Sequence, residues 1–292
     1  MKRGVFLAIL SSVTFSIMNA FVKAVSDTVP PAEIVFFRSV IGTVLIYLFM
    51  MKSRVRFSTS GIPMLMLRGV FGALYLLAYF YTISRITLAD ASILAHLSPF
   101  FAVLFSFLFL KERIPRKTLA ILPLVILGMV LLTKPGTYTS YSLYALVGVL
   151  SALFAGGAAV SIRFLSRKHH SFEIVFYFLA TATLVAIPLM WKDFVLPSFT
   201  DLLLLIVIGV VSLLGQLFLT QAFSHESVVV VEIARYIGIV FNALWGFLFW
   251  TEVPDLFTIS GGFLIITACI YLSQTRGEAR SKGRNLIPVI KR

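Results

Sequence analysis

Ionisable residues and cysteine are scarce in this sequence. Charged residues make up 13% of the 292 positions, about half the share found in soluble domains. A single cysteine, Cys269, excludes an intramolecular disulfide. The four histidines lack the spacing of a metal site, and the chain has neither a Gly-Lys phosphate loop nor a Gly-x-Ser-x-Gly turn. We therefore expect no metal, no cofactor and no direct use of ATP.

Apolar residues, in contrast, are abundant. They form 59% of the chain, and the mean hydropathy is +0.99. Successive apolar runs are long enough to cross a ~30 Å hydrocarbon core as helices, and the separators leave no room for a soluble domain. The sequence therefore predicts an all-α integral membrane protein with ten transmembrane helices, at residues 4–25, 32–51, 62–84, 88–110, 118–134, 142–164, 172–191, 201–223, 227–250 and 256–274.

One stretch of the chain occurs twice. Residues 87–113 return at an offset of 140 as residues 227–253, and the same offset aligns the Glu-Ile-Val-Phe of residues 33–36 with that of residues 173–176. Each copy contains five spans, an odd number, so the second copy is predicted to be inverted in the membrane, as in alternating-access carriers. The predicted divisions are residues 1–136 for the first five-helix repeat, 137–275 for the second and 276–292 for a basic cytoplasmic tail.

The net charge of +13 arises from Lys and Arg in short loops and tails. Loops rich in these residues are retained on the cytoplasmic side, so both termini are predicted to be cytoplasmic in an inner membrane. Lipid, not nucleic acid, is therefore the expected surrounding partner. The predicted inner segments hold Lys2, Arg3, Lys52, Arg54, Arg56, Lys111, Arg113, Arg116, Lys117, Arg167, Lys168 and the cations of the tail, whereas the outer segments hold little more than Arg85, Lys134 and Lys192.

The borders of the fourth span resemble a known family. Its entry reads TLADA at residues 87–91, its middle LSP at residues 97–99 and its exit LKER at residues 110–113. Together with the five-plus-five layout, these motifs resemble the EamA-type carriers of the drug/metabolite transporter superfamily, over nearly the whole chain. The resemblance implies a ten-helix carrier of small metabolites in which the fourth and ninth spans line a central cavity. The second copy departs from the first, since Ile239 stands at the equivalent of Pro99.

A few ionisable residues fall inside the predicted spans, where each needs a partner or a function. Glu232 and Arg235, at i and i+3 of the ninth span, can face one cavity beside Tyr236, either as substrate ligands or as a structural pair. His96 of the fourth span is either a satisfied core residue or a gate, proton acceptor or substrate ligand. Pro99 removes a backbone hydrogen bond and predicts a helix break or gate at the carbonyl of Ala95.

Other polar residues allow two interpretations each. Arg38 and Arg68 can either reach the lipid interface by extending their side chains or line the cavity. Asn19 and Gln216 supply polar groups for substrate or for hydrogen bonds between helices. Tyr79 can stack on a flat substrate or fill the core.

The sequence favours a secondary active transporter that works by alternating access. Because buried cations outnumber buried acids, we expect an anionic or zwitterionic cargo such as a carboxylate, an amino acid or a nucleotide-like metabolite. Proton coupling through Glu232 or His96 is a further hypothesis, and a homodimer is compatible with the sequence. The alternative is an integral-membrane enzyme acting on lipid. That function would require clustered acids or a His-Asp-Ser set at one membrane face, which the sequence does not offer.

Overall fold

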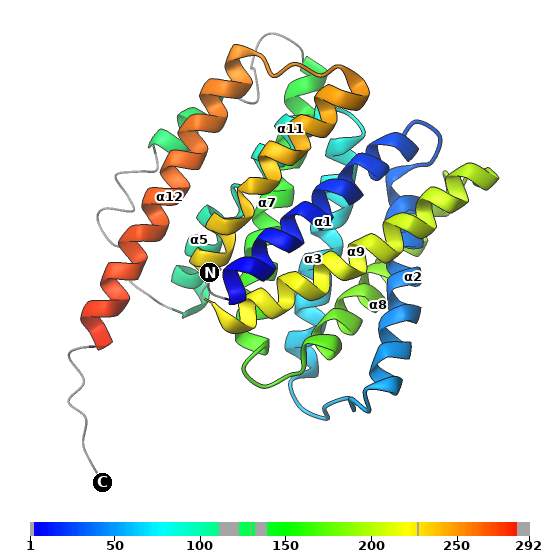
Figure 1. Ribbon diagram of the computed structural model, residues 1–292, viewed down its shortest axis with the longest axis horizontal. Coiled ribbons are helices and arrows are strands. Elements are labelled where there is room, and N and C mark those ends of the chain that lie inside the picture. The colour runs from blue at the N-terminus through cyan, green and yellow to red at the C-terminus, as the bar shows by residue number, and fades with distance from the viewer. Residues whose placement is uncertain (1–2, 111–122, 129, 132–138, 227, 285–292) are drawn as a thin grey trace.

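Every regular element that the computed structural model describes is a helix. The description covers residues 3–110, 123–128, 130–131, 139–226 and 228–284. The helices are α1 (Arg3–Val25), α2 (Pro31–Lys52), α3 (Ile62–Ile83), α4 (Leu88–Ala95), α5 (Ser98–Leu110), α7 (Thr139–Leu165), α8 (Ser171–Met190), α9 (Phe199–His225), α10 (Val228–Arg235), α11 (Ile237–Trp250) and α12 (Leu256–Arg284). Figure 1 shows them as one bundle of long, tilted helices.

Length and composition confirm the membrane-spanning fold. Within the described residues, seven helices are long and apolar enough to cross a membrane, and shorter apolar helices cover Leu88–Ala102 and Leu256–Ala268. Of the predicted span 118–134, residues 123–128 and 130–131 are described, and they are helical. The remainder of that span, and the predicted boundary between residues 136 and 137, lie outside the described residues. The chain is an all-α integral membrane protein built as two five-helix repeats.

The fourth and ninth spans are each interrupted. The sequence predicted a helix break in the fourth span, from Pro99, but it carried no such signal in the ninth span. The first break separates α4 from α5 at His96, and the second separates α10 from α11 at Tyr236. These two positions are 140 residues apart, so both copies break at the same place. Proline does not explain this shared feature, because the second copy carries Ile239 where the first carries Pro99. In the first copy α4 ends at Ala95, whose helical donor at i+4 would be Pro99, a residue without an N–H.

The two repeats interlock through matched pairs of helices. α1 of the first repeat packs along α9 of the second, α3 packs along α7, and α2 packs along α8, as Figure 1 shows for the α1–α9 and α2–α8 pairs. α1 and α3 are the first and third helices of the first repeat, and α7 and α9 are the first and third helices of the second. The α1–α9 and α3–α7 pairs are therefore the same contact, related by the duplication. This exchange places residues from both repeats around the centre of the molecule.

Two glycines at equivalent positions allow close approaches between the repeats. A Cβ atom on Gly69 would lie 2.6 Å from Cβ of Thr181, and one on Gly209 would lie 2.7 Å from Cγ2 of Ile41. Both the glycines and their neighbours are related by the offset of 140. Small residues allow helices to approach closely in membranes, where packing replaces the hydrophobic effect as the driving force. The duplication has therefore preserved one contact in both halves.

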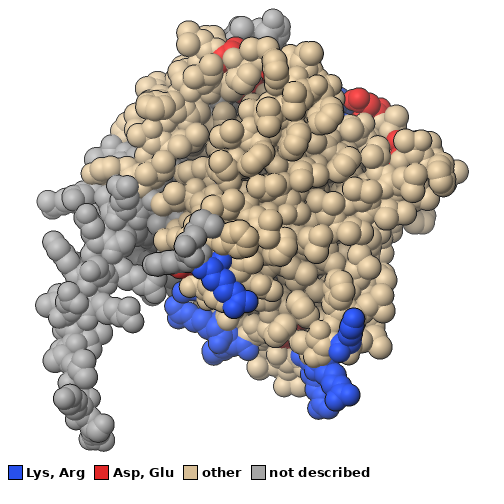
Figure 2. Space-filling view, in the orientation of Figure 1, with Lys and Arg blue, Asp and Glu red and all other residues tan. Residues whose placement is uncertain are grey.

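The two ends of the bundle differ in charge. Exposed Lys and Arg follow the last turns of α2 and α7, and Figure 2 shows the basic side chains gathered on the lower side of the molecule. α1 begins on this side, and α12 runs towards it as far as Arg284, ten residues past the predicted end of the last span. Residues 285–292 of the predicted tail lie outside the described residues. The basic residues of the two loops are Lys52, Arg54, Arg56, Arg167 and Lys168.

We expect Gly69→Ala and Gly209→Ala to destabilise the protein by about 1–3 kcal/mol each, because the new methyl group must displace a packed neighbour. Gly238→Ala is the matched control, since its Cβ would meet the Cβ of Ser12 at an ordinary 3.4 Å. Apparent melting temperatures in detergent measure the difference. If Gly69→Ala melts no lower than Gly238→Ala, the close contact does not hold the repeats together.

Candidate functional site

A cavity at the centre of the bundle collects polar side chains from both repeats. The empty space among its lining residues is about 890 Å³, a figure that includes the part open to solvent. Eight of the nine predicted substrate ligands line it: Asn19, Arg38, Arg68, Tyr79, His96, Gln216, Glu232 and Arg235. Neither Tyr236 nor Pro99 is among the lining residues.

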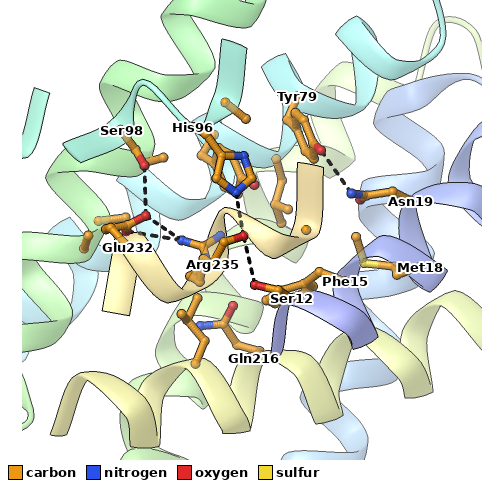
Figure 3. A pocket seen from close by; sticks show the side chains of 18 of the residues that line it. Ser12, Phe15, Met18, Asn19, Tyr79, His96, Ser98, Gln216, Glu232 and Arg235 are labelled. Carbon is orange, nitrogen blue, oxygen red and sulfur yellow. Dashed lines mark hydrogen bonds and ion pairs between the residues drawn. The ribbon is translucent and has the colours of Figure 1, made fainter. Parts of the chain in front are cut away.

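Glu232 and Arg235 form an ion pair at the end of α10. Nη1 of Arg235 donates to both carboxylate oxygens of Glu232, at 3.2 and 3.1 Å, and the hydroxyl of Ser98 donates to the same carboxylate at 3.3 Å (Figure 3). The i, i+3 spacing on a helix brings the two charges together, as the sequence predicted. Glu232 is buried, but 17% of the Arg235 side chain is exposed. Arg235 is therefore the partly exposed member of the pair, and its Nε is buried with no hydrogen-bond partner among the described residues.

His96 joins the break in the first repeat to the break in the second. Its Nε2 lies 3.1 Å from the carbonyl oxygen of Arg235, the last residue of α10, and its Nδ1 lies 2.7 Å from the carbonyl of Ser92. The hydroxyl of Ser12 donates to the same Arg235 carbonyl at 3.2 Å (Figure 3). The ring of Tyr236 contacts the imidazole with centroids 5.6 Å apart. A carbonyl that the helix break leaves without its usual donor is thus satisfied by side chains.

Asparagines and a tyrosine form a second polar cluster in the cavity. Nδ2 of Asn19 donates to the hydroxyl of Tyr79 at 3.0 Å and to Oδ1 of Asn242 at 3.1 Å. Nδ2 of Asn242 donates in turn to the hydroxyl of Ser92 and to the carbonyl of Gly238. These bonds connect α1, α3, α4 and α11. The Tyr79 ring stacks on Tyr75 at 5.5 Å, so aromatic packing accounts for that face of the ring.

Arg38 of α2 and Arg68 of α3 are the least satisfied cations in the described part of the chain. Their exposed fractions are 1% and 3%, which rules out the predicted alternative of anchoring at the lipid interface. Nε and Nη1 of each side chain are buried and have no hydrogen-bond partner among the described residues. Both guanidiniums pack against the ring of Phe178, at 5.7 Å for Arg38 and 4.3 Å for Arg68. Cation–π contacts of this kind only partly replace hydration.

Gln216 lines the cavity, but its amide group is hydrogen-bonded within its own helix and is less available to a ligand than the sequence suggested. Its Nε2 donates to the hydroxyl of Thr220 within the same helix, at 3.3 Å. Further residues line the cavity that no sequence pattern had selected, and most of them are apolar: Phe15, Met18, Ala155, Phe178 and Phe223, together with Ser98. An apolar residue within an apolar span carries no signal that separates a cavity wall from ordinary core.

Side-chain contacts tie the elements at the end opposite the basic loops. Lys23 of α1 pairs with Glu252, whose other oxygen accepts the backbone N–H of Leu88 at the start of α4. Asp90 of α4 accepts hydrogen bonds from Tyr141 of α7 and from Thr258 of α12. Asp90 lies in the first turn of α4, where a carboxylate complements the helix dipole, and it also joins three helices.

The sequence profile of the EamA-like transporter family matches residues 2–134 and, a second time, residues 142–274. The chain belongs to the EamA-like transporter family. The pseudopaline exporter of Pseudomonas aeruginosa is 64% identical to it over 277 residues, which cover 94% of this chain and 98% of the exporter. The S-adenosylmethionine uptake transporter of Rickettsia prowazekii is 24% identical over 281 residues, 95% of each protein. This chain is therefore a membrane transporter of small metabolites, and the alternative of a lipid enzyme is dropped.

The fold is also found in a solved structure. A crystal structure with 20% sequence identity to this chain superposes with a TM-score of 0.64, over 94% of this chain and 97% of the other. At this identity the likeness concerns the fold alone.

Proposed function

We propose that this EamA family member exports a small, net anionic metabolite from the cytoplasm by alternating access, and that pseudopaline or a close analogue is the cargo. One observation carries the charge assignment: three guanidiniums line the cavity against one carboxylate, which leaves an excess of two positive charges. An excess charge inside a membrane protein is costly unless a ligand of opposite sign offsets it. The direction and the named cargo rest on the 64% identical pseudopaline exporter.

The arrangement of the helices supports alternating access. The cavity lies between two interlocked repeats, and both breaks, at His96 and at Tyr236, occur beside it. Broken helices at the interface of inverted repeats are typical of carriers that rock about a fixed central site. The contacts at the end opposite the basic loops are polar and join few residues. They are the ion pair of Lys23 with Glu252 and the hydrogen bond of Thr258 to Asp90. Such contacts can exchange between two states more readily than a packed apolar core.

Arg235→Ala should raise the apparent KM for pseudopaline at least about tenfold in inside-out vesicles, because a charge-assisted bond to the anion is lost. Membrane abundance should change far less. Arg167→Ala, in an exposed loop, is the matched control and should transport normally.

The single change leaves Glu232 buried without its partner, so a fall in abundance could have a structural cause. The double variant Glu232→Gln/Arg235→Ala removes that unpaired charge and should restore abundance without restoring transport. Two results would contradict the proposed role. In the first, abundance and transport fall equally in both variants. In the second, the wild type fails to transport pseudopaline, as do both variants.

Proton coupling through His96 is supported by the acceptors that surround the imidazole. Both ring nitrogens face carbonyl oxygens, those of Ser92 and Arg235. A neutral imidazole has one N–H and can donate to only one of them, whereas an imidazolium donates to both. The Arg235 guanidinium opposes a second positive charge nearby, and Glu232 partly offsets it. Uptake of a proton would therefore strengthen the link between the two helix breaks.

Inside-out vesicles with an acidic lumen should accumulate pseudopaline faster than vesicles without a pH gradient, because a proton would leave the lumen as cargo enters. His96→Gln keeps a donor and an acceptor but cannot titrate, so it should transport without responding to the gradient. Transport by the wild type that ignores the gradient would remove proton coupling.

We also infer that both termini lie in the cytoplasm and that the membrane is the inner one. The gathering of Lys and Arg on one side of the bundle supports this orientation, since such loops are retained in the cytoplasm (Figure 2). In a Cys269→Ser background, a cysteine at Ser53 should be protected from an impermeant maleimide in intact cells, and one at Asp193 should be labelled. The reverse pattern would invert the assignment.

A further inference from the structure

We propose that the cavity contains two chemically different subsites and that together they select an amino acid whose far end bears additional carboxylates. Arg38 and Arg68 form the first subsite, a clamp for carboxylates. Glu232 and Arg235 form the second, in which Glu232 accepts an ammonium group and Arg235 holds the adjacent carboxylate. This inference rests on the proposed function and specifies its substrate class.

The clamp differs from the ion pair in what satisfies each charge. Arg235 has Glu232 as a partner within the protein, whereas Arg38 and Arg68 form no ion pair with any described residue. Both are more than nine-tenths buried and line the cavity. A guanidinium presents its N–H groups as a planar fork that matches a carboxylate. The two unpaired forks therefore call for anionic oxygens that none of the described residues supplies.

The protein is built to hold these two cations in place. The ring of Phe178 contacts both guanidiniums, and a Cβ atom on Gly72 would collide with Nη1 of Arg68 and with the Phe178 ring. Glycine at this position therefore leaves the space that the Arg68 guanidinium occupies.

The duplication provides an independent comparison. At an offset of 140, the equivalent of Arg38 is Phe178 and the equivalent of Arg68 is Ile208. The second repeat thus builds the same helices with apolar residues at both positions. The cations are not required by the fold, which leaves ligand binding as their use.

The second subsite accounts for the amino end. Glu232 is the one acid among the described residues that line the cavity, and it lies beside Arg235, whose side chain is partly exposed. An α-amino acid presents an ammonium and a carboxylate on one carbon, which matches this pair of opposite charges. With the pair neutral overall, the clamp alone supplies the excess of two positive charges. A cargo with one ammonium and three carboxylates would balance it.

Four small probes test the two subsites on the purified full-length chain in detergent, with dissociation constants measured by calorimetry or thermal shift. The wild type should rank γ-carboxyglutamate above glutamate, and glutamate above glutamine, as far-end carboxylates are removed. It should bind glutamate more tightly than glutarate, which lacks the ammonium group.

Each clamp variant should lose one kind of discrimination and keep the other. Arg38→Gln and Arg68→Gln should reduce the preference for glutamate over glutamine about tenfold, the usual effect of losing a charge-assisted bond, and leave the preference over glutarate intact. Glu232→Gln should keep the preference for glutamate over glutamine and lose the preference for glutamate over glutarate. Arg38→Lys should retain part of the preference, and Arg167→Gln, an exposed loop variant, should retain all of it.

Three results would overturn the proposal. The first is that the clamp variants weaken the binding of glutamate and of glutamine equally. The second is that none of the four probes binds the wild type. The third is that O-phosphoserine, tested as a fifth compound, binds more tightly than γ-carboxyglutamate, which would assign the clamp to phosphate. Ratios measured within one variant are independent of its stability. As a further check, ligand-free Arg38→Met should melt no lower than the wild type, because it removes an unpaired buried charge. A lower melting temperature would indicate a structural role.

Transport separates this inference from the proposed function. If vesicles export pseudopaline but the probes show no discrimination, the subsites are wrong and the carrier stands. If discrimination is found but pseudopaline is not transported, the subsites stand and the export of that cargo is wrong.

Discussion

Hydrocarbon offers neither a hydrogen-bond partner nor water, so each buried charge and each broken helix in this molecule must be satisfied by the protein or by the cavity. The carbonyl oxygen of Arg235, at the end of α10, is hydrogen-bonded to the Ser12 hydroxyl and the His96 imidazole. The carboxylate of Glu232 accepts hydrogen bonds from Arg235 and Ser98. Arg38 and Arg68 have no such donor or acceptor in the described protein. The same constraint therefore gathers the polar residues at one place and identifies two guanidiniums that form no hydrogen bond or ion pair with the described residues.

Duplication explains the scaffold better than it explains the site. The glycine contacts and the helix breaks recur in both repeats at an offset of 140. The polar residues of the cavity do not recur, since the equivalents of Arg235, Asn19 and Arg38 are Ala95, Ala159 and Phe178. Two copies of one bundle thus supply the opposing walls that rocking requires, while substitutions in single copies supply the chemistry. A symmetric carrier can in this way hold an asymmetric molecule.

Much of the site could be selected from the sequence, because a charge within an apolar span is rare and needs a reason. Glu232, Arg235 and His96 were recognised on this ground, and the structure brings them together. The sequence could not decide whether Arg38 and Arg68 reach the lipid interface or line the cavity, because a residue at a given depth along a helix can face either one. Phe178 could not be selected at all, since its surroundings in sequence are equally apolar.

The sequence by itself determined the class of molecule, the number of spans and the duplication, since hydropathy and a fixed offset are local properties that survive without knowledge of the fold. Only the tertiary structure decided that the ninth span breaks as the fourth does and which cations face the cavity. The break in the ninth span depends on what satisfies the freed carbonyl of Arg235, and the groups that contact it, Ser12 and His96, both come from the other repeat. Contacts between residues more than a hundred positions apart are not encoded in any local pattern.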